Sequence, residues 1–154
     1  MQEPIKVVLY ERNKNVRDLF TDLLSESERV QLSYAFEYTN NALAQIEWIQ
    51  PDVVIIDTEV CDNNGLDVLR ALRMTHPHVK IMILCNEKNK HHIFRALCCG
   101  AQGYVLKTDM IYQLECAIRA VYNGFGYLSA TIIPDVINLF TTNFEPQLSL
   151  ATAD

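Results

Sequence analysis

The sequence predicts an α/β protein built on one parallel sheet, with helices covering both faces. Short apolar runs alternate along the chain with longer segments in which apolar residues recur every three or four positions. The run 53–56 is apolar at every position, which is typical of a strand buried on both faces. Five successive strand–helix units imply right-handed crossovers, and therefore a doubly wound sheet of five parallel strands.

The first three expected strands differ in pattern. The first is a short apolar run that ends where Glu11 begins a polar segment, and the second alternates apolar and polar residues. Pro51 ends the helix before the third strand, which closes on Asp57. The predicted strands comprise residues 5–10, 30–36, 53–57, 79–84 and 103–106.

A helix is expected after each strand. Thr39 and Asn40 are candidate N-caps of the second helix, and Gly100 ends the fourth. His91 and His92 are interpreted as a solvated start of the fourth helix. The apolar spacing places the five helices within residues 16–24, 43–49, 66–74, 93–99 and 110–121.

The last part of the chain differs from the rest. A sixth helical pattern covers 132–140, and from Thr141 the composition is typical of a linker or tail. We therefore divide the chain into a domain at 1–124 and a linker helix with tail at 125–154.

Composition excludes several classes of function. The net charge of −6 and the pI near 5.1 disfavour direct nucleic-acid binding, because phosphate contact needs a basic face. No apolar run approaches membrane-spanning length, and the first residues lack a secretory pattern, so we expect a cytoplasmic protein that does not bind membranes. The five cysteines lack zinc-site spacing and are expected to be free thiols.

Polar residues gather at the expected carboxyl ends of the strands. Glu11 and Arg12 follow the first strand, Asp57 ends the third, Cys85 follows the fourth and Lys107 follows the fifth. In a doubly wound sheet these ends meet at one crevice. There Asp57 could accept a phosphoryl group and Lys107 could neutralise its oxygens. Glu11 could hold Mg²⁺ or its water. Alternatively, Asp57 only caps the next turn.

These residues resemble the receiver domain of two-component response regulators. Asp57 with Gly65 eight positions later resembles the phosphoacceptor loop, Lys107 the lysine after the last strand, and Tyr104 the aromatic switch position. The segment 100–107 is the most specific match. The segments 122–124 and 127–129 are similar to the NarL/FixJ subgroup, in which a linker helix leads to a LuxR-type helix-turn-helix DNA-binding domain. The resemblance covers residues 4–140.

The resemblance implies a flavodoxin-like, CheY-like fold and a signalling module rather than an enzyme. It makes Asp57 the phosphoacceptor, a sensor histidine kinase the phosphoryl donor, and Glu11 with Asp57 an acidic pocket for Mg²⁺. It also implies a homodimer, through a face built from the fourth helix, fifth strand and fifth helix or through one built from the first and fifth helices. DNA contact would need a C-terminal domain that this chain lacks.

The chain departs from the family pattern at the ends of two strands and also after Asp57, where Val60-Cys61 replaces the usual Met-Pro. Arg12 stands where the family has its second acidic residue, and Cys85 stands where a Ser or Thr hydroxyl binds the phosphoryl group. In one interpretation, Arg12 is a solvated residue that weakens metal binding. In the other, the guanidinium of Arg12 occupies the metal site and pairs with Asp57. Lys107 could be a structural partner of Asp57 as well as a phosphate ligand, and Tyr104 could be an ordinary core residue.

These residues are compatible with three functions. The first is an atypical receiver of a transcriptional regulator, with the efficiency of its phosphorylation left open. The second is a pseudo-receiver that acts by protein–protein contact or dimerisation without phosphorylation. The third, an enzyme, is disfavoured because no general base or glycine-rich phosphate loop is found. A redox role of Cys61 or Cys85 is a further alternative. It is disfavoured because a thiol at such a place more often packs as a small hydrophobic side chain.

Overall fold

The computed structural model describes residues 2–60 and 65–143 and contains a single parallel sheet. The strand order is β2-β1-β3-β4-β5-β6, and every neighbouring pair is parallel. This confirms the doubly wound fold, but the prediction of five strands was one too few. The strands are β1 (Ile5–Tyr10), β2 (Val30–Phe36), β3 (Val53–Asp57), β4 (Lys80–Cys85), β5 (Gly103–Leu106) and β6 (Tyr127–Leu128).

The additional strand, β6, lies at the edge of the sheet beside β5. Gly124 turns the chain with a φ of 88°, which only glycine adopts without strain. The backbone N–H of Tyr127 then donates to the carbonyl of Gln102, and that of Ser129 donates to the carbonyl of Tyr104. A strand of two residues carries no detectable periodicity, so the sequence pattern could not predict it.

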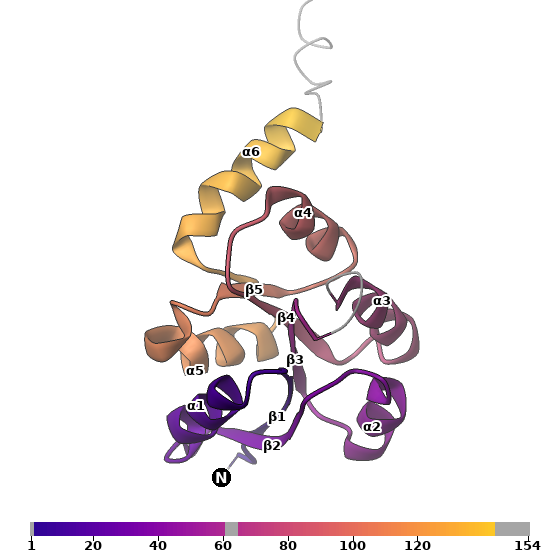
Figure 1. Cartoon of the computed structure of the whole chain (residues 1–154), viewed down its shortest axis with the longest axis vertical. Coiled ribbons are helices and arrows are strands. Elements are labelled where there is room, and N and C mark those ends of the chain that lie inside the picture. The colour runs from indigo at the N-terminus through magenta and orange to yellow at the C-terminus, as the bar shows by residue number, and fades with distance from the viewer. Residues whose placement is uncertain (1, 61–64, 144–154) are drawn as a thin grey trace, which may run out of the picture.

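The helices cover the two faces of the sheet unequally. Figure 1 shows α1 and α5 on one side and α2, α3 and α4 on the other. The predicted N-caps of α2 were wrong, because Asn41 occupies the cap position and makes no side-chain hydrogen bond there. The helices are α1 (Lys14–Leu24), α2 (Ala42–Ile49), α3 (Leu66–Thr75), α4 (Lys90–Cys98), α5 (Met110–Tyr122) and α6 (Ile133–Asn143), with a 3-10 turn at Ala130–Ile132.

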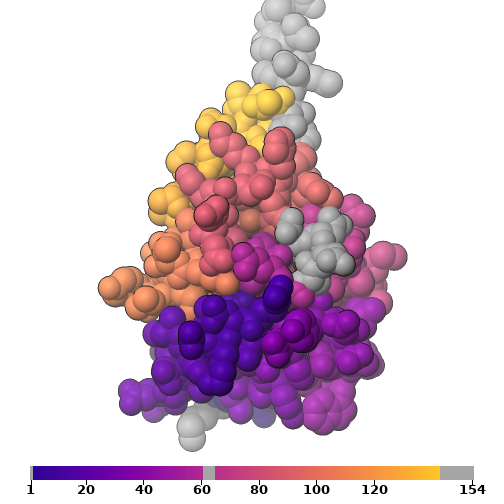
Figure 2. Space-filling view, viewed as in Figure 1, coloured from indigo at the N-terminus to yellow at the C-terminus, as the bar shows by residue number. Residues whose placement is uncertain are grey.

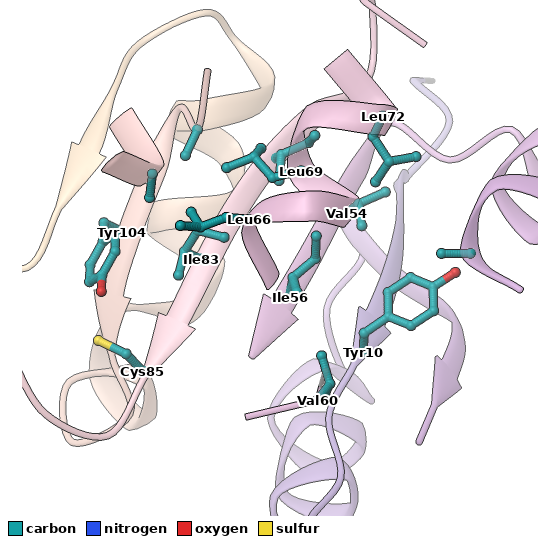
Figure 3. Packing of buried hydrophobic residues seen from close by; sticks show 14 of the residues in the cluster. Tyr10, Val54, Ile56, Val60, Leu66, Leu69, Leu72, Ile83, Cys85 and Tyr104 are labelled. Carbon is teal, nitrogen blue, oxygen red and sulfur yellow. The ribbon is translucent and has the colours of Figure 1, made fainter. Parts of the chain in front are cut away.

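Two apolar cores hold these layers together. The core between the sheet and α2–α4 contains Ile56, Leu69 and Tyr104 (Figure 3). The core under α1 and α5 contains Phe20 and Ile118. All five residues of β3 are buried, so its backbone is clamped between both cores and fixes the position of the carboxylate at its end.

The edge strand β2 contains a β-bulge. The register with β1 shifts between Val7 and Val8, and Ser33 has no partner there. Leu32 therefore packs in the core under α1 and α5, whereas Phe36 packs in the opposite core. The alternating apolar residues of this strand do not share one face, although their pattern predicted the strand itself.

The last helix, α6, extends past the sheet and packs on α4 (Figures 1 and 2). Asp135 on α6 forms ion pairs with Lys88 and Lys90, at 3.4 and 4.0 Å. These contacts join α6 to the start of α4. Within residues 2–60 and 65–143, no helix has the length and apolar character needed to span a membrane.

Candidate functional site

Asp57 is the last residue of β3 and is 1% exposed. Its Oδ2 accepts a hydrogen bond from the backbone N–H of Glu59 at 3.2 Å, which fixes the orientation of the carboxylate. Gly65 is the N-cap of α3 and has a φ of 82°, and a Cβ there would lie 3.1 Å from Ile56 Cγ2. The glycine after the loop is therefore required by backbone conformation and by close packing.

Lys107 lies between two carboxylates from different strands. Its Nζ is 2.5 Å from Glu11 Oε1 and 3.0 Å from Asp57 Oδ1. The backbone N–H of Lys107 donates to the carbonyl of Cys85, which extends the pairing of β4 with β5 up to the site. The structure thus brings together Glu11, Asp57 and Lys107, which the sequence placed at the ends of β1, β3 and β5.

Burial controls the charges in this pocket. Glu11 is fully buried, and burial together with the neighbouring Asp57 raises its pKa to about 7. Burial by itself disfavours the charged form of Lys107, but its bonds to Glu11 and Asp57 outweigh this and raise its pKa. The ammonium is therefore charged at neutral pH, while Glu11 exchanges a proton there.

The pocket has capacity for a cation. Both Glu11 oxygens and Asp57 Oδ1 lack a hydrogen bond of good geometry among the described residues. Mg²⁺ is usually held by one or two carboxylates and several waters, so Glu11 and Asp57 fit such an ion. No cluster of three or more Asp, Glu, His or Cys side chains suited to a metal occurs in the described part of the chain.

Arg12 lies outside the pocket. Its side chain is exposed, and among the described residues the cation paired with Asp57 is Lys107. The backbone carbonyls of Glu11 and Arg12 accept hydrogen bonds from the guanidinium of Arg17, which fixes the turn before α1. The exposed side chain matches the interpretation of Arg12 as a solvated residue, and the alternative pairing with Asp57 is not found among the described residues.

Cys85 and Tyr104 lie on neighbouring strands beside the carboxylates. Burial raises the pKa of the Cys85 thiol to about 11, so very little thiolate exists at neutral pH. This disfavours a redox role for Cys85, and Cys61 lies outside the described residues. The ring of Tyr104 is directed into the core, and its hydroxyl lies 2.7 Å from Nδ1 of His92 (Figure 3 shows the tyrosine and Cys85).

Comparison with known proteins identifies the family to which this arrangement belongs. The family model for the response regulator receiver domain matches residues 7–119. The chain belongs to this family. Arg12 and Cys85 both lie within the residues that the family model matches.

Curated relatives of this receiver domain are regulators. They include the response regulator GacA of Pseudomonas syringae pv. syringae, 27% identical over 97% of this chain and 69% of the relative. The response regulator protein VraR of Staphylococcus saprophyticus is 24% identical over 88% of this chain and 65% of the relative, and the oxygen regulatory protein NreC of Staphylococcus haemolyticus is 27% identical over 90% and 64%. The chain therefore spans about two thirds of the length of these relatives.

Solved structures share the fold. A LuxR-family two-component response regulator from Aurantimonas sp. SI85-9A1 superposes with a TM-score of 0.82 at 20% identity, covering 90% of this chain and 99% of that one. The isolated receiver domain of RcsB from Salmonella enterica serovar Typhimurium, determined with the phosphomimetic BeF3−, gives 0.78 at 18% identity over 86% and 98%.

Sequence reasoning missed one residue of this receiver domain. His92 was interpreted as solvated, but it is 7% exposed and bonded to Tyr104, so that interpretation was wrong. The signal was present in the spacing, because His92, Ile93 and Ala96 lie on one helical face and all three are buried.

Proposed function

We propose that this receiver domain belongs to a transcriptional regulator and that Asp57 is its phosphoacceptor. The pocket would work without the second acidic residue and the Ser or Thr hydroxyl of the family pattern. The observation that carries the proposal is the position of the Lys107 ammonium, 3.0 Å from Asp57 Oδ1 at the carboxyl edge of the sheet. A cation at this distance is placed to neutralise oxygens on a phosphoryl group attached to Asp57.

The transfer step uses the carboxylate as a nucleophile. An Asp57 oxygen forms a bond to phosphorus as the bond between phosphorus and the donor breaks, and the donor leaves with that electron pair. The Glu59 N–H holds Oδ2, and Lys107 holds Oδ1, so the carboxylate is oriented before the donor arrives. Mg²⁺, when held by Asp57 and Glu11, would add positive charge at the transferred oxygens.

Arg12 and Cys85, which depart from the family pattern, determine how efficiently we expect Asp57 to be phosphorylated. Arg12 supplies no carboxylate to a metal, and the Cys85 thiol is a weaker hydrogen-bond donor than a hydroxyl. We therefore expect slow phosphorylation and weak Mg²⁺ binding. Tyr104 stays assigned to the switch position, and Lys107 and Cys85 to the phosphoryl-binding positions.

The second candidate is a pseudo-receiver that acts without phosphorylation. It is favoured by Lys107, whose single ammonium already bridges both buried carboxylates, and the three groups together carry no net charge when Glu11 holds its proton. In this case the chain would serve as a protein–protein contact or dimerisation module in its present conformation.

The relatives support a wider proposal. A sensor histidine kinase would be the donor, signalling would take place in the cytoplasm, and DNA would be contacted only by a C-terminal domain following residues 125–154. We propose homodimerisation through the α4-β5-α5 face or the α1-α5 face. Both faces include α5, on which Ile111 and Tyr112 are 51% and 89% exposed.

Intact mass spectrometry separates the two candidates. The protein is incubated with acetyl phosphate and Mg²⁺, and the Asp57→Ala variant is treated in parallel. A gain of one phosphoryl group that is missing from the variant supports the first candidate. A saturating donor that leaves the wild-type mass unchanged rejects it and leaves the pseudo-receiver.

A further inference from the structure

A buried hydrogen bond joins β5 to α4 beside the carboxylate pocket. The Tyr104 hydroxyl lies 2.7 Å from His92 Nδ1, with ring centroids 5.7 Å apart and planes tilted by 60°. The two side chains are 1% and 7% exposed. A buried hydroxyl is stable only when it is hydrogen-bonded, so the partner of Tyr104 decides whether the ring can stay in this position.

Two groups compete for the Tyr104 hydroxyl. Burial, together with the nearby Cys85, raises the pKa of Tyr104 well above its ordinary value, so the phenol stays neutral and keeps its proton. The Cys85 thiol is within hydrogen-bonding reach, but sulfur is a weak donor and a weak acceptor. The imidazole of His92 is the stronger partner.

Local structure fixes His92 in place. Asn89 caps α4, and its side chain accepts a hydrogen bond from the backbone N–H of His92 at 3.0 Å. The cap sets the first turn of the helix, so that His92 faces the sheet together with Ile93 and Ala96. The imidazole is therefore presented to β5 by a rigid helix start and not by a free loop.

The bond connects the pocket with the last helix. Tyr104 pairs with Ile83 on one side and Leu128 on the other, and Lys107 directly follows the same strand. On the other side of the bond, α4 supports α6 (Figure 1). A change in Tyr104 would thus move the strand end that carries Lys107 and the helix on which α6 rests.

We propose that His92 is a positioning residue that holds Tyr104 in its buried orientation and fastens α4 to β5. Position 85 is a cysteine in this chain, so no hydroxyl there can hydrogen-bond to Tyr104. His92 supplies that hydrogen bond instead, and the identities of residues 85 and 92 are therefore linked. The proposal goes beyond phosphorylation of Asp57, because it concerns the contact between α4 and β5 and not the chemistry of the carboxylate.

Cys85 is a native reporter for this arrangement. Its thiol lines a cleft of about 390 Å³ together with Asn89, His92 and Tyr104. The thiol is 2% exposed, so a reagent reaches it only when this region opens. Iodoacetamide alkylation of the native protein, followed by peptide mass mapping, measures that opening, and the exposed Cys98 serves as an internal control.

Three single variants test the bond. His92→Phe keeps a ring but removes the hydrogen-bonding nitrogen, and Tyr104→Phe removes one oxygen atom. Each is expected to raise the alkylation rate of Cys85 about tenfold, the effect of losing one buried hydrogen bond of ordinary strength, with Cys98 unchanged. His92→Asn carries Oδ1 at the same bond separation from Cα as Nδ1, so it should stay within about twofold of wild type.

The double variant completes the test. If the two groups act through one bond, His92→Phe with Tyr104→Phe raises the Cys85 rate no more than the larger single change does. Effects that multiply, or a Cys85 rate unchanged in either single variant, overturn the proposal. If His92→Phe unfolds, as circular dichroism would reveal, the Tyr104→Phe rate decides alone.

Discussion

The buried Glu11 carboxyl makes stability depend on pH in a way that one substitution can remove. Burial and the neighbouring Asp57 raise the pKa of Glu11 from 4.5 to about 7 in the folded protein. The folded state therefore binds more protons than the unfolded state between these values, and stability falls as pH rises through that window. Glu11→Gln keeps the shape of the side chain but cannot ionise.

The size of the effect follows from the two pKa values. Integrating the proton difference between pH 5 and pH 8 gives a loss of about 2.5 kcal/mol that Glu11 contributes to the wild type and the glutamine variant avoids. Other titrating groups are common to both proteins and cancel in the comparison. The variant should thus gain about 2.5 kcal/mol relative to wild type when the pH is raised from 5 to 8.

Urea unfolding at both pH values, with a chelator to exclude divalent cations, measures this difference. Glu26→Gln, which alters an exposed carboxylate, controls for the loss of one negative charge. If the free-energy difference between Glu11→Gln and wild type is the same at pH 5 and pH 8, the carboxyl of Glu11 titrates normally and the description of the pocket is wrong.

Three further predictions concern the pocket and the surface. Arg12→Asp adds a carboxylate beside Glu11 and should raise Mg²⁺ affinity about tenfold or more by calorimetric titration; unchanged affinity would show that Arg12 does not limit metal binding. Lys107→Met leaves two buried carboxylates without a cation and should destabilise the protein by about 3 kcal/mol in urea at pH 8, and by less at pH 5, where Glu11 is protonated; equal losses would contradict this. Ile111→Asp places a charge on α5 and should weaken any dimer at least tenfold in sedimentation equilibrium, whereas a dimer that is unaffected must use another surface.

The strand ends could be predicted because they depend only on topology. Apolar periodicity located the strands β1 to β5, and parallel strands necessarily bring their carboxyl ends together, so Glu11, Asp57 and Lys107 were placed in one crevice. The pairing of Lys107 with both carboxylates could not be predicted in detail. It depends on which of two neighbouring cations, Arg12 or Lys107, is directed inward, and a residue at the beginning of a helical turn can face either way.

Features decided by a single hydrogen bond or a short pairing escaped the sequence analysis. The two residues of β6 are too few to show a period, and the burial of His92 was hidden by its polar neighbours Lys90 and His91. The bulge at Ser33 preserved the alternation in the sequence while turning the second half of β2 to the opposite face. Such features depend on tertiary contacts rather than on local pattern.

The bulge in β2 also affects how the protein behaves at high concentration. Residues 30–36 contain no charged side chain and no proline, and β2 forms one edge of the sheet. An uncharged edge of this length is a template for pairing with other chains. The extra residue at Ser33 interrupts the regular spacing of hydrogen-bonding groups, so a second strand cannot align along the whole edge. The opposite edge, β6, offers only two residues. Neither edge of the sheet therefore presents a long, regular row of backbone groups on which another chain could pair.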